Sequence, residues 1–201
     1  MKKNFTIINY GVANYNSITG SLRRLGHNCN ITSNKSEIKK SDFIILPGVG
    51  TFPSAKKNLI KYDLIKFLKK IIKDGTPTLG ICLGMHLLAD SSNEINFQKG
   101  LSFFQGRVVQ NKINKSHIGW NKVVITQKNS IFKELNNRMF YFQHSYSLIG
   151  KKKDIKGFTR FNKKVIPSIV SNRNLIGVQF HPEKSQENGL LFFEKFIDWF
   201  K

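Results

Sequence analysis

The chain has 201 residues, of which 40% are hydrophobic and 12% aromatic, and this composition excludes intrinsic disorder. At this length we expect one globular domain spanning residues 1–201. Lysine and arginine number 33 against 12 acidic residues, which gives a formal net charge of +21. Lysine makes up 27 of the basic residues, whereas phosphate-binding sites favour arginine. The excess of positive charge therefore indicates AT-rich codon usage first, and partner docking or nucleic-acid binding only after it.

The first half alternates short apolar strands with helices. Strands are predicted at Phe5–Asn9, Asp42–Leu46 and Thr78–Ile81. Helices are predicted over Asn16–Leu25, which a glycine follows, and over Ile60–Lys73, where isoleucine and leucine recur at helical spacing. Since apolar strands separated by helices build parallel sheets that are buried on both faces, we expect an α/β fold.

The second half changes to short strands joined by Asn, Lys and Gly turns. Examples are Asn121–Thr126, Met139–His144 and Leu175–Phe180. An amphipathic helix over Gly189–Phe200 closes the chain, and one side of it carries Leu190, Phe193, Ile197 and Phe200. We therefore expect a mixed, mainly parallel sheet with flanking helices and an antiparallel portion in this half.

Cysteine usage and hydropathy favour a cytoplasmic protein without a membrane span. Cys29 and Cys82 make no disulfide framework and no C-x-x-C pair. The longest apolar stretch, Thr78–Ala89, is too short to cross a bilayer. The N-terminal apolar segment is interrupted by polar residues and lacks a cleavage site of small residues.

A candidate nucleophile lies in Gly80-Ile81-Cys82-Leu83-Gly84, between a predicted strand and an apolar helical stretch. A nucleophile on a sharp strand-to-helix turn needs small neighbours on both sides, because larger side chains would collide across the turn. Such a turn exposes the sulfur at a helix N-terminus, which favours the thiolate. The alternative is a buried cysteine in a glycine-rich turn.

His181-Pro182-Glu183 offers a general base and a group to orient it. In extended chain, residues two apart point to the same side, so Glu183 can bond one imidazole nitrogen while the other faces a thiol. The alternative is a surface His and Glu beside a proline. H-x-E also opens a zinc deaminase signature, but the P-C-x-x-C that this site needs is missing, so we expect no metal.

A third element, Pro47-Gly48-Val49-Gly50, directly follows a predicted strand. A loop with two glycines presents backbone N–H groups that can bind a carboxylate or a developing oxyanion. The alternative is an ordinary turn. The loop indicates an anion-binding site only in combination with the two motifs above.

Together the motifs resemble those of the class I (triad) glutamine amidotransferases. The similarity extends in order over nearly the whole chain, through Asn9-Tyr10-Gly11-Val12-Ala13-Asn14, Pro47-Gly48-Val49-Gly50, Gly80-Ile81-Cys82-Leu83-Gly84-Met85, His117-Ile118-Gly119-Trp120-Asn121, Tyr141-Phe142-Gln143-His144-Ser145-Tyr146 and Gln179-Phe180-His181-Pro182-Glu183-Lys184-Ser185. The resemblance implies a flavodoxin-like fold and no cofactor. The finer motifs are similar to those of members that feed ammonia to a (β/α)8-barrel cyclase subunit in histidine synthesis.

The resemblance also implies a role for individual residues. Cys82 would attack the side-chain amide of L-glutamine, with His181 shuttling protons and Glu183 holding it. The implied oxyanion hole uses backbone N–H groups of Leu83, Val49 and Gly50. The resemblance implies contacts with glutamine at Gly48, Gly50, His86, His144, Ser145 and Tyr146. It implies contacts with the barrel partner at Asn14, Asn121 and Lys184.

Two positions depart from the family pattern. Asn9 stands where the family usually has Asp, and His86 stands where it usually has Gln. Because His86 is four residues after Cys82, we expect it on the same helix face, beside the sulfur. An ordinary histidine there would make glutamine affinity depend on pH between about 5.5 and 7.5. The alternative is that His86 packs under the sheet and touches no substrate.

Two other functions stay open at this point. A paralogue with the same glutaminase chemistry could serve sugar amidation in surface-polysaccharide synthesis. A non-catalytic module could instead use the basic surface to bind nucleic acid, with steep salt dependence. The second alternative has no use for an intact Cys82, His181 and Glu183 set, and we expect neither nucleic acid nor membrane as a partner.

Overall fold

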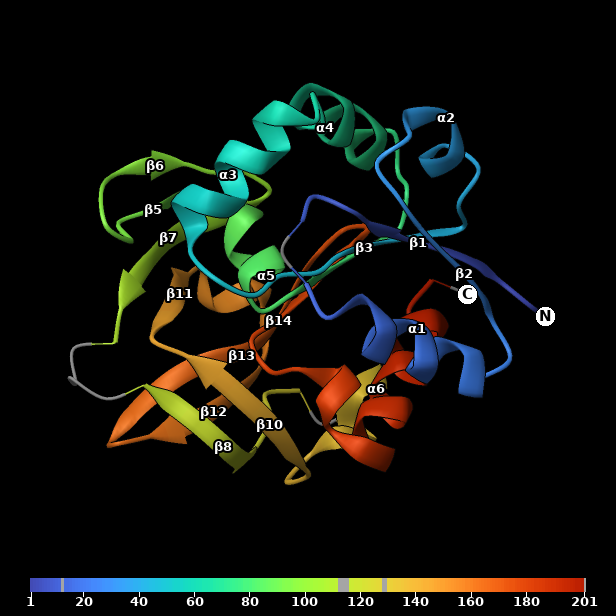
Figure 1. Ribbon diagram of the computed structural model, residues 1–201. Coiled ribbons are helices and arrows are strands. Elements are labelled where there is room, and N and C mark those ends of the chain that lie inside the picture. Colours follow the sequence, from blue (N-terminus) through green and yellow to red (C-terminus); the bar gives the residue numbers. More distant parts are fainter. Residues whose placement is uncertain (12, 112–115, 128–129, 201) are drawn as a thin grey trace.

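A computed structural model describes residues 1–11, 13–111, 116–127 and 130–200, so that Val12 of the first motif lies outside the described residues. Its centre is an eight-stranded sheet in the order β2-β1-β3-β4-β14-β13-β12-β9 (Figure 1). The first five of these strands run parallel, and they are β1 (Asn4–Ile8), β2 (Asn28–Thr32), β3 (Phe43–Leu46), β4 (Thr78–Ile81) and β14 (Leu175–Val178). The last three are antiparallel, and they are β13 (Lys164–Asn172), β12 (Ile155–Phe161) and β9 (Val124–Ile125). The expected mixed sheet is confirmed.

Helices cover both faces of the parallel part (Figure 1). One face packs against α3 (Phe52–Lys61), α4 (Ile65–Lys73) and α5 (Leu83–Leu87). The other face packs against α1 (Tyr15–Arg24) and α6 (Gln186–Asp198). Alternation along β3 explains this arrangement, since Ile44 and Leu46 join the first core cluster while Phe43 and Ile45 join the second. A one-turn helix, α2 (Lys35–Ile38), connects β2 to β3.

Two small sheets complete the fold. One pairs β8 (His117–Lys122) with β10 (Met139–His144) in antiparallel register. The other has the order β11-β7-β5-β6, formed by β5 (Ala89–Ser92), β6 (Gln98–Lys99), β7 (Phe104–Gln110) and β11 (Tyr146–Gly150). Short 3-10 helices lie at Ile131–Leu135, Lys152–Asp154 and Pro182–Lys184.

Two predicted helices differ from the observed ones. The helix predicted over Ile60–Lys73 is wrong as one element, because the chain turns after Lys61 and Asp63 adopts a φ of 50° before α4 begins. The apolar spacing continued across the turn, since Leu64 is buried as well, and this hid the break. The closing helix begins earlier than predicted, and Phe192 and Phe196 lie fully buried on its inner side.

Close packing of α6 on the Pro182 segment gives a test of the fold. A Cβ at Gly189 would lie 1.8 Å from the Pro182 carbonyl oxygen, whereas a Cβ at the helical Gly20 would meet nothing within 4 Å. We expect Gly189→Ala to lower the free energy of unfolding by about 3 kcal/mol, because the backbone must shift. Gly20→Ala, the matched control, should raise it by about 0.5–1 kcal/mol. Urea denaturation of both variants measures this, and equal stabilities would contradict the packing.

Candidate active site

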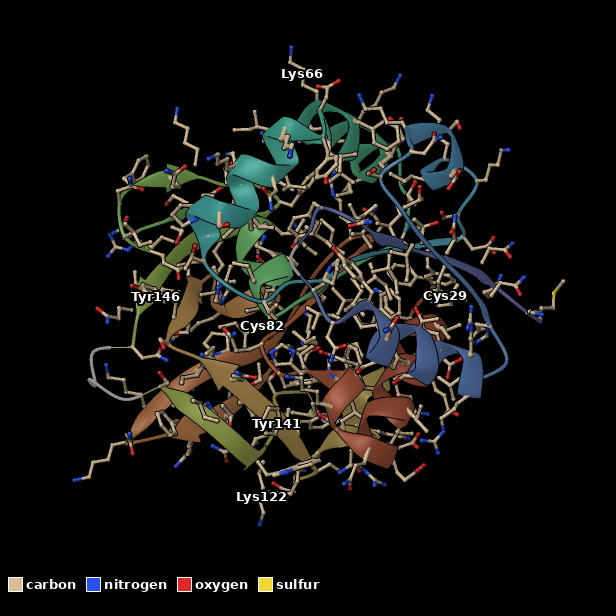
Figure 2. All side chains as sticks on the ribbon, in the orientation of Figure 1. Cys29, Lys66, Cys82, Lys122, Tyr141 and Tyr146 are labelled. Carbon is tan, nitrogen blue, oxygen red and sulfur yellow. The ribbon has the colours of Figure 1, made fainter. Side chains whose placement is uncertain are left out.

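Three neighbouring parallel strands bring the sequence motifs together. β3 leads into the Pro47–Gly50 loop, β4 into Cys82, and β14 into the His181–Glu183 segment. Because β3, β4 and β14 are adjacent and parallel, their carboxyl ends meet at one edge of the sheet, where open α/β sheets bind ligands. Figure 2 shows Cys82 where β4 passes into α5, near the middle of the molecule.

The backbone at Cys82 is strained, with a φ of 51° and a ψ of −107°. Glycines on both sides permit the turn. A Cβ at Gly80 would lie 2.8 Å from the backbone nitrogen of Met85, and one at Gly84 would lie 1.8 Å from the Leu46 carbonyl oxygen. The first turn of α5 therefore rests directly on the end of β3, and this contact holds the Cys82 side chain at the sheet edge.

His181 and Glu183 form a buried pair next to the sulfur. His181 Nδ1 lies 2.8 Å from Glu183 Oε1, and both side chains are 2% exposed. The His181 N–H donates to the Tyr141 carbonyl oxygen at 2.8 Å. Ser185 Oγ donates to the His181 carbonyl oxygen and accepts from the Tyr141 N–H. These hydrogen bonds fix the His181 backbone between β10 and the residue that precedes α6, and Glu183 orients the ring.

Electrostatics favour a protonated His181. Burial alone would lower the pKa of His181, but the charge and hydrogen bond of Cys82 and the hydrogen bond and charge of Glu183 raise it to about 10. The ring is therefore an imidazolium at neutral pH, and it can stabilise negative charge that develops on the Cys82 sulfur during a reaction. A cationic imidazole beside a cysteine is the arrangement that activates a cysteine nucleophile.

A cavity of about 300 Å³ opens in front of Cys82. Its volume suits one small polar molecule. The predicted site residues in its lining are Val49, Gly50, Cys82, Leu83, His86, His144, Ser145, Tyr146 and His181. Glu183 lies behind His181 and outside the lining. Gly48 is also outside it, because Gly48 is buried where a Cβ would come within 2.7 Å of Leu83 Cβ.

The loop that follows β3 reaches the rim of this cavity. Val49 is 40% exposed, and Gly50 adopts a φ of +98°, a conformation that favours glycine. Both residues line the cavity together with Leu83, which follows the nucleophile. The backbone groups proposed for an oxyanion hole thus come from the loop after β3 and from the start of α5.

Glu94 is a lining residue that sequence analysis missed. It is 8% exposed, its Oε2 accepts a hydrogen bond of 2.8 Å from the Phe52 N–H, and burial raises its pKa. The residue lies beyond β5 with no motif around it, and its partner is 42 residues away. No sequence signal could have found it, because the contact exists only once α3 and β5 have packed.

His86 lines the cavity, but its predicted titration between pH 5.5 and 7.5 is wrong. Burial lowers the pKa of His86 to about 4, although a hydrogen bond from Nε2 to Gln179 Oε1 at 2.9 Å works in the opposite direction. The ring is therefore neutral at physiological pH. The sequence placed His86 beside Cys82 but could not show how deeply the ring is buried.

The predicted partner residues lie outside the cavity lining. Lys184 Nζ donates to Gln143 Oε1 at 3.2 Å and sits 5.6 Å from the Tyr141 ring centroid. Asn121 donates to the Arg160 carbonyl oxygen at 2.9 Å, and Asn14 is exposed just before α1. Asn9, the other departure from the family pattern, accepts from the Gly11 N–H through its side chain.

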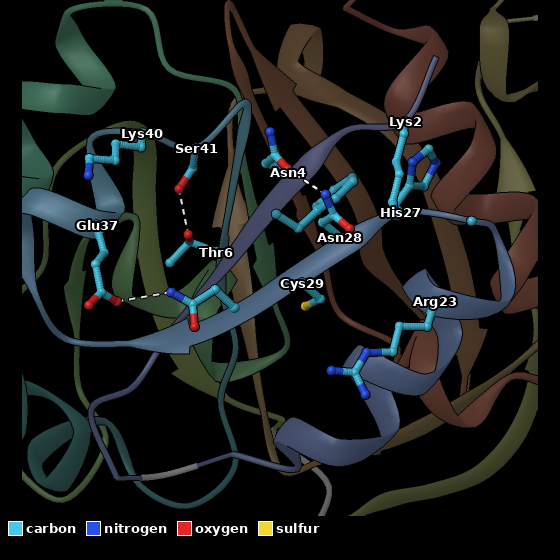
Figure 3. Close-up of a pocket in the computed structure, with 13 residues that line it drawn as sticks. Lys2, Asn4, Thr6, Arg23, His27, Asn28, Cys29, Glu37, Lys40 and Ser41 are labelled. Carbon is cyan, nitrogen blue, oxygen red and sulfur yellow. Dashed lines mark hydrogen bonds between the residues drawn. The ribbon is translucent and has the colours of Figure 1, made fainter.

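Cys29, the second cysteine, lacks such surroundings. It lies in a hollow of about 640 Å³ over β1 and β2 (Figure 3). Burial raises the pKa of the Cys29 thiol, whose sulfur lies 3.7 Å from Thr19 Oγ1. The polar side chains of this hollow bond to one another, as Asn28 does to Asn4. His27 and Glu37 also line the hollow, but the interactions described for the Cys29 thiol are with Thr19 and Arg23.

The structure also bears on metals and membranes. Within residues 1–11, 13–111, 116–127 and 130–200, no three His, Cys, Asp or Glu side chains are grouped so that they could hold a metal ion. Over the same ranges, no helix has the length and apolar character needed to cross a membrane.

Comparison with known proteins adds independent information. Residues 6–199 match the family described as glutamine amidotransferase class-I. The chain is 43% identical to imidazole glycerol phosphate synthase subunit HisH 2 of Methanococcus maripaludis, over 95% of this chain and 97% of that one. It is 38% identical to subunit HisH of Lactococcus lactis, over 98% of both. PurLQS from Thermotoga maritima has a similar structure, with a TM-score of 0.78 at 18% identity over 100% of both chains.

The raised pKa of His181 gives a second test. We expect its ring to stay protonated up to about pH 9, because the Cys82 and Glu183 charges offset burial. In Cys82→Ala the pKa should fall well below 10, since burial then acts against Glu183 alone. Histidine NMR titration of both proteins measures this. An unchanged His181 pKa in the variant would show that the sulfur does not interact with the ring.

Proposed function

Because the chain belongs to the class I glutamine amidotransferases, we propose that it is the glutaminase subunit of imidazole glycerol phosphate synthase. It hydrolyses L-glutamine and supplies ammonia to a (β/α)8-barrel cyclase subunit in histidine synthesis. The observation that carries the proposal is the buried Cys82, His181 and Glu183 set at the mouth of a cavity of amino-acid size. The HisH relatives, which match this chain over nearly its full length, support the assignment to the histidine pathway.

The geometry suits acyl transfer through a thioester. The Cys82 thiolate attacks the side-chain amide carbon of glutamine, and the carbonyl oxygen becomes an oxyanion that backbone N–H groups of Leu83 and the Val49–Gly50 segment receive. The His181 imidazolium gives its proton to the amide nitrogen, the C–N bond breaks, and ammonia leaves. Neutral His181 then takes a proton from water, whose oxygen attacks the thioester, and glutamate and the Cys82 thiolate are released.

The cavity also offers groups for the amino-acid end of glutamine. Glu94 presents a buried carboxylate, which can pair with the α-ammonium group. Ser145 and Tyr146 line the same cavity and can hydrogen-bond the α-carboxylate. A carboxylate and neutral hydrogen-bond donors at this end of the cavity suit the α-ammonium and α-carboxylate groups of an amino acid such as glutamine.

The surface beside the cavity suits a partner subunit. Ile118 and Trp120 are 62% and 44% exposed on β8, and Trp120 is paired in register with Tyr141, whose ring Lys184 approaches. An exposed apolar strand bordered by a cation is typical of an interface. We place the barrel partner here, together with Asn121 and Asn14. Both cysteines are free, which fits the cytoplasm as the compartment of this reaction.

Removal of the nucleophile tests the proposal. We expect Cys82→Ala to abolish glutamine hydrolysis in the complex with the cyclase, because no other thiol can form the thioester. Synthesis from added ammonia should survive, since free ammonia bypasses the hydrolysis step. Cys29→Ala is the matched control and should keep glutaminase activity. Near wild-type glutamine hydrolysis by Cys82→Ala would refute the assignment.

Substitution of Glu94 tests its proposed role in binding the α-ammonium group of glutamine. Glu94→Gln keeps an oxygen to accept from the Phe52 N–H but loses the charge that pairs with the α-ammonium group. We expect KM for glutamine to rise about tenfold or more, with a smaller change in kcat, because the lost interaction is present before and during the reaction. Glu194→Gln, an exposed change on α6, should leave both constants as they are. An unchanged KM for glutamine in Glu94→Gln would show that the Glu94 charge does not contribute to glutamine binding.

A further inference from the structure

Gln179 lies between His86 and Cys82 and belongs to no role assigned above. Its side chain is fully buried at the end of β14. Gln179 Oε1 lies 2.9 Å from His86 Nε2, and Gln179 Nε2 lies 3.7 Å from Cys82 Sγ. One amide thus contacts the candidate nucleophile with one end and a cavity-lining imidazole with the other.

The chemistry of the partners fixes the direction of both hydrogen bonds. The amide Nε2 is the end that lies 3.7 Å from Cys82 Sγ, and the thiolate, which is the reactive form in the proposed reaction, can only accept a hydrogen bond. The amide oxygen then faces His86, and since this oxygen can only accept, His86 must carry its proton on Nε2. The opposite amide orientation would place a carbonyl oxygen against a thiolate, where two negative groups repel.

This assignment determines what His86 offers to the cavity. A neutral ring protonated at Nε2 has a lone pair on Nδ1, and in the described part of the chain no side chain or backbone group is bonded to that atom. His86 lines the cavity beside Cys82. The free nitrogen is therefore a hydrogen-bond acceptor, and glutamine carries N–H groups that such an acceptor can receive.

We propose that Gln179 is a positioning residue, which stabilises the Cys82 thiolate with its NH₂ group and holds His86 in the Nε2–H tautomer with its oxygen. This proposal rests on the glutaminase function proposed above. It gives one buried amide two effects: a larger thiolate fraction at the nucleophile and a fixed acceptor for the substrate.

Other titratable groups around the sulfur set the background for any pH measurement. His181 interacts with Cys82 most directly, and Tyr10, whose hydroxyl bonds the Pro47 carbonyl oxygen, has a pKa raised by burial and by the charges of Tyr15 and Cys82. His144 lines the same cavity, and burial lowers its pKa to about 3. These groups remain unchanged in a Gln179 variant, so a difference between variants isolates the amide.

Two variants of Gln179 separate the two hydrogen bonds. Gln179→Met keeps the volume and removes both bonds. Gln179→Glu keeps an acceptor for His86 but places an anion where the donor to Cys82 was. The first measurement is the rate of Cys82 alkylation by iodoacetamide against pH, quantified on the Cys82 peptide by mass spectrometry so that Cys29 does not interfere. The second is the ¹⁵N signal pair of the His86 ring, assigned with His86→Gln.

We expect the midpoint of Cys82 alkylation against pH to rise by about one pH unit in Gln179→Met and by more in Gln179→Glu. The His86 ring should lose its single tautomer in Gln179→Met and keep it in Gln179→Glu. In the complex with the cyclase, kcat for glutamine should fall about tenfold in Gln179→Met. Gln105→Glu, an exposed change on β7, is the charge-matched control and should alter none of these values.

Unchanged alkylation profiles in both folded variants, together with an unchanged His86 tautomer in Gln179→Met, would overturn the proposal and leave Gln179 as a packing residue. Should Gln179→Met fail to fold, Gln179→Glu decides alone, because it has nearly the same shape as the native side chain. Absence of glutaminase activity in the wild-type complex would refute the proposed function instead. The alkylation and NMR measurements need no turnover, so the two failures are distinguishable.

Discussion

The close approach of α5 to the end of β3 is the contact on which the site depends. Cys82 is held at a φ of 51°, and for a residue with a side chain such a conformation costs of order 1–3 kcal/mol. Surrounding structure must impose it. Gly84 allows the Leu46 carbonyl to come within 1.8 Å of the place where a Cβ would be, and Gly80 allows α5 to fold back over β4. The close packing of α5 against β3 and β4 thus imposes the turn at Cys82 that directs the sulfur into the cavity.

The buried pair of His181 and Glu183 shows how burial and charge act against each other. Burial by itself favours a neutral imidazole, so the imidazolium persists only because anionic groups face it. Glu183 Oε2 is buried and has no hydrogen-bond partner among the described side chains and backbone groups. Leaving a buried acceptor unpaired is costly, but no other donor then competes for the carboxylate charge. The carboxylate therefore acts on His181 alone.

Structural features that depend on neighbouring residues in the sequence were predicted from local motifs. Features that depend on tertiary packing were not. Cys82 and its glycines, and His181 with Glu183, are local patterns, and β4 and β10 have the predicted bounds. The break between α3 and α4 was hidden because the residues of the turn keep the apolar spacing. Glu94 was missed because it meets Phe52 only in the folded chain. The neutrality of His86 follows from burial, which no motif encodes.

His86 and Gln179 together show how a histidine can serve where the family pattern leads us to expect an amide. An amide side chain offers a donor and an acceptor at every pH, whereas histidine does so only when neutral and only in one tautomer. Burial keeps the pKa of His86 at about 4, which meets the first condition. Gln179 meets the second, since its oxygen accepts from Nε2 while its nitrogen faces Cys82. Gln179 follows β14 directly and His181 is two residues later, and both side chains interact with the Cys82 sulfur. The strand end after β14 thus supplies both the base and the group that adapts the cavity to histidine.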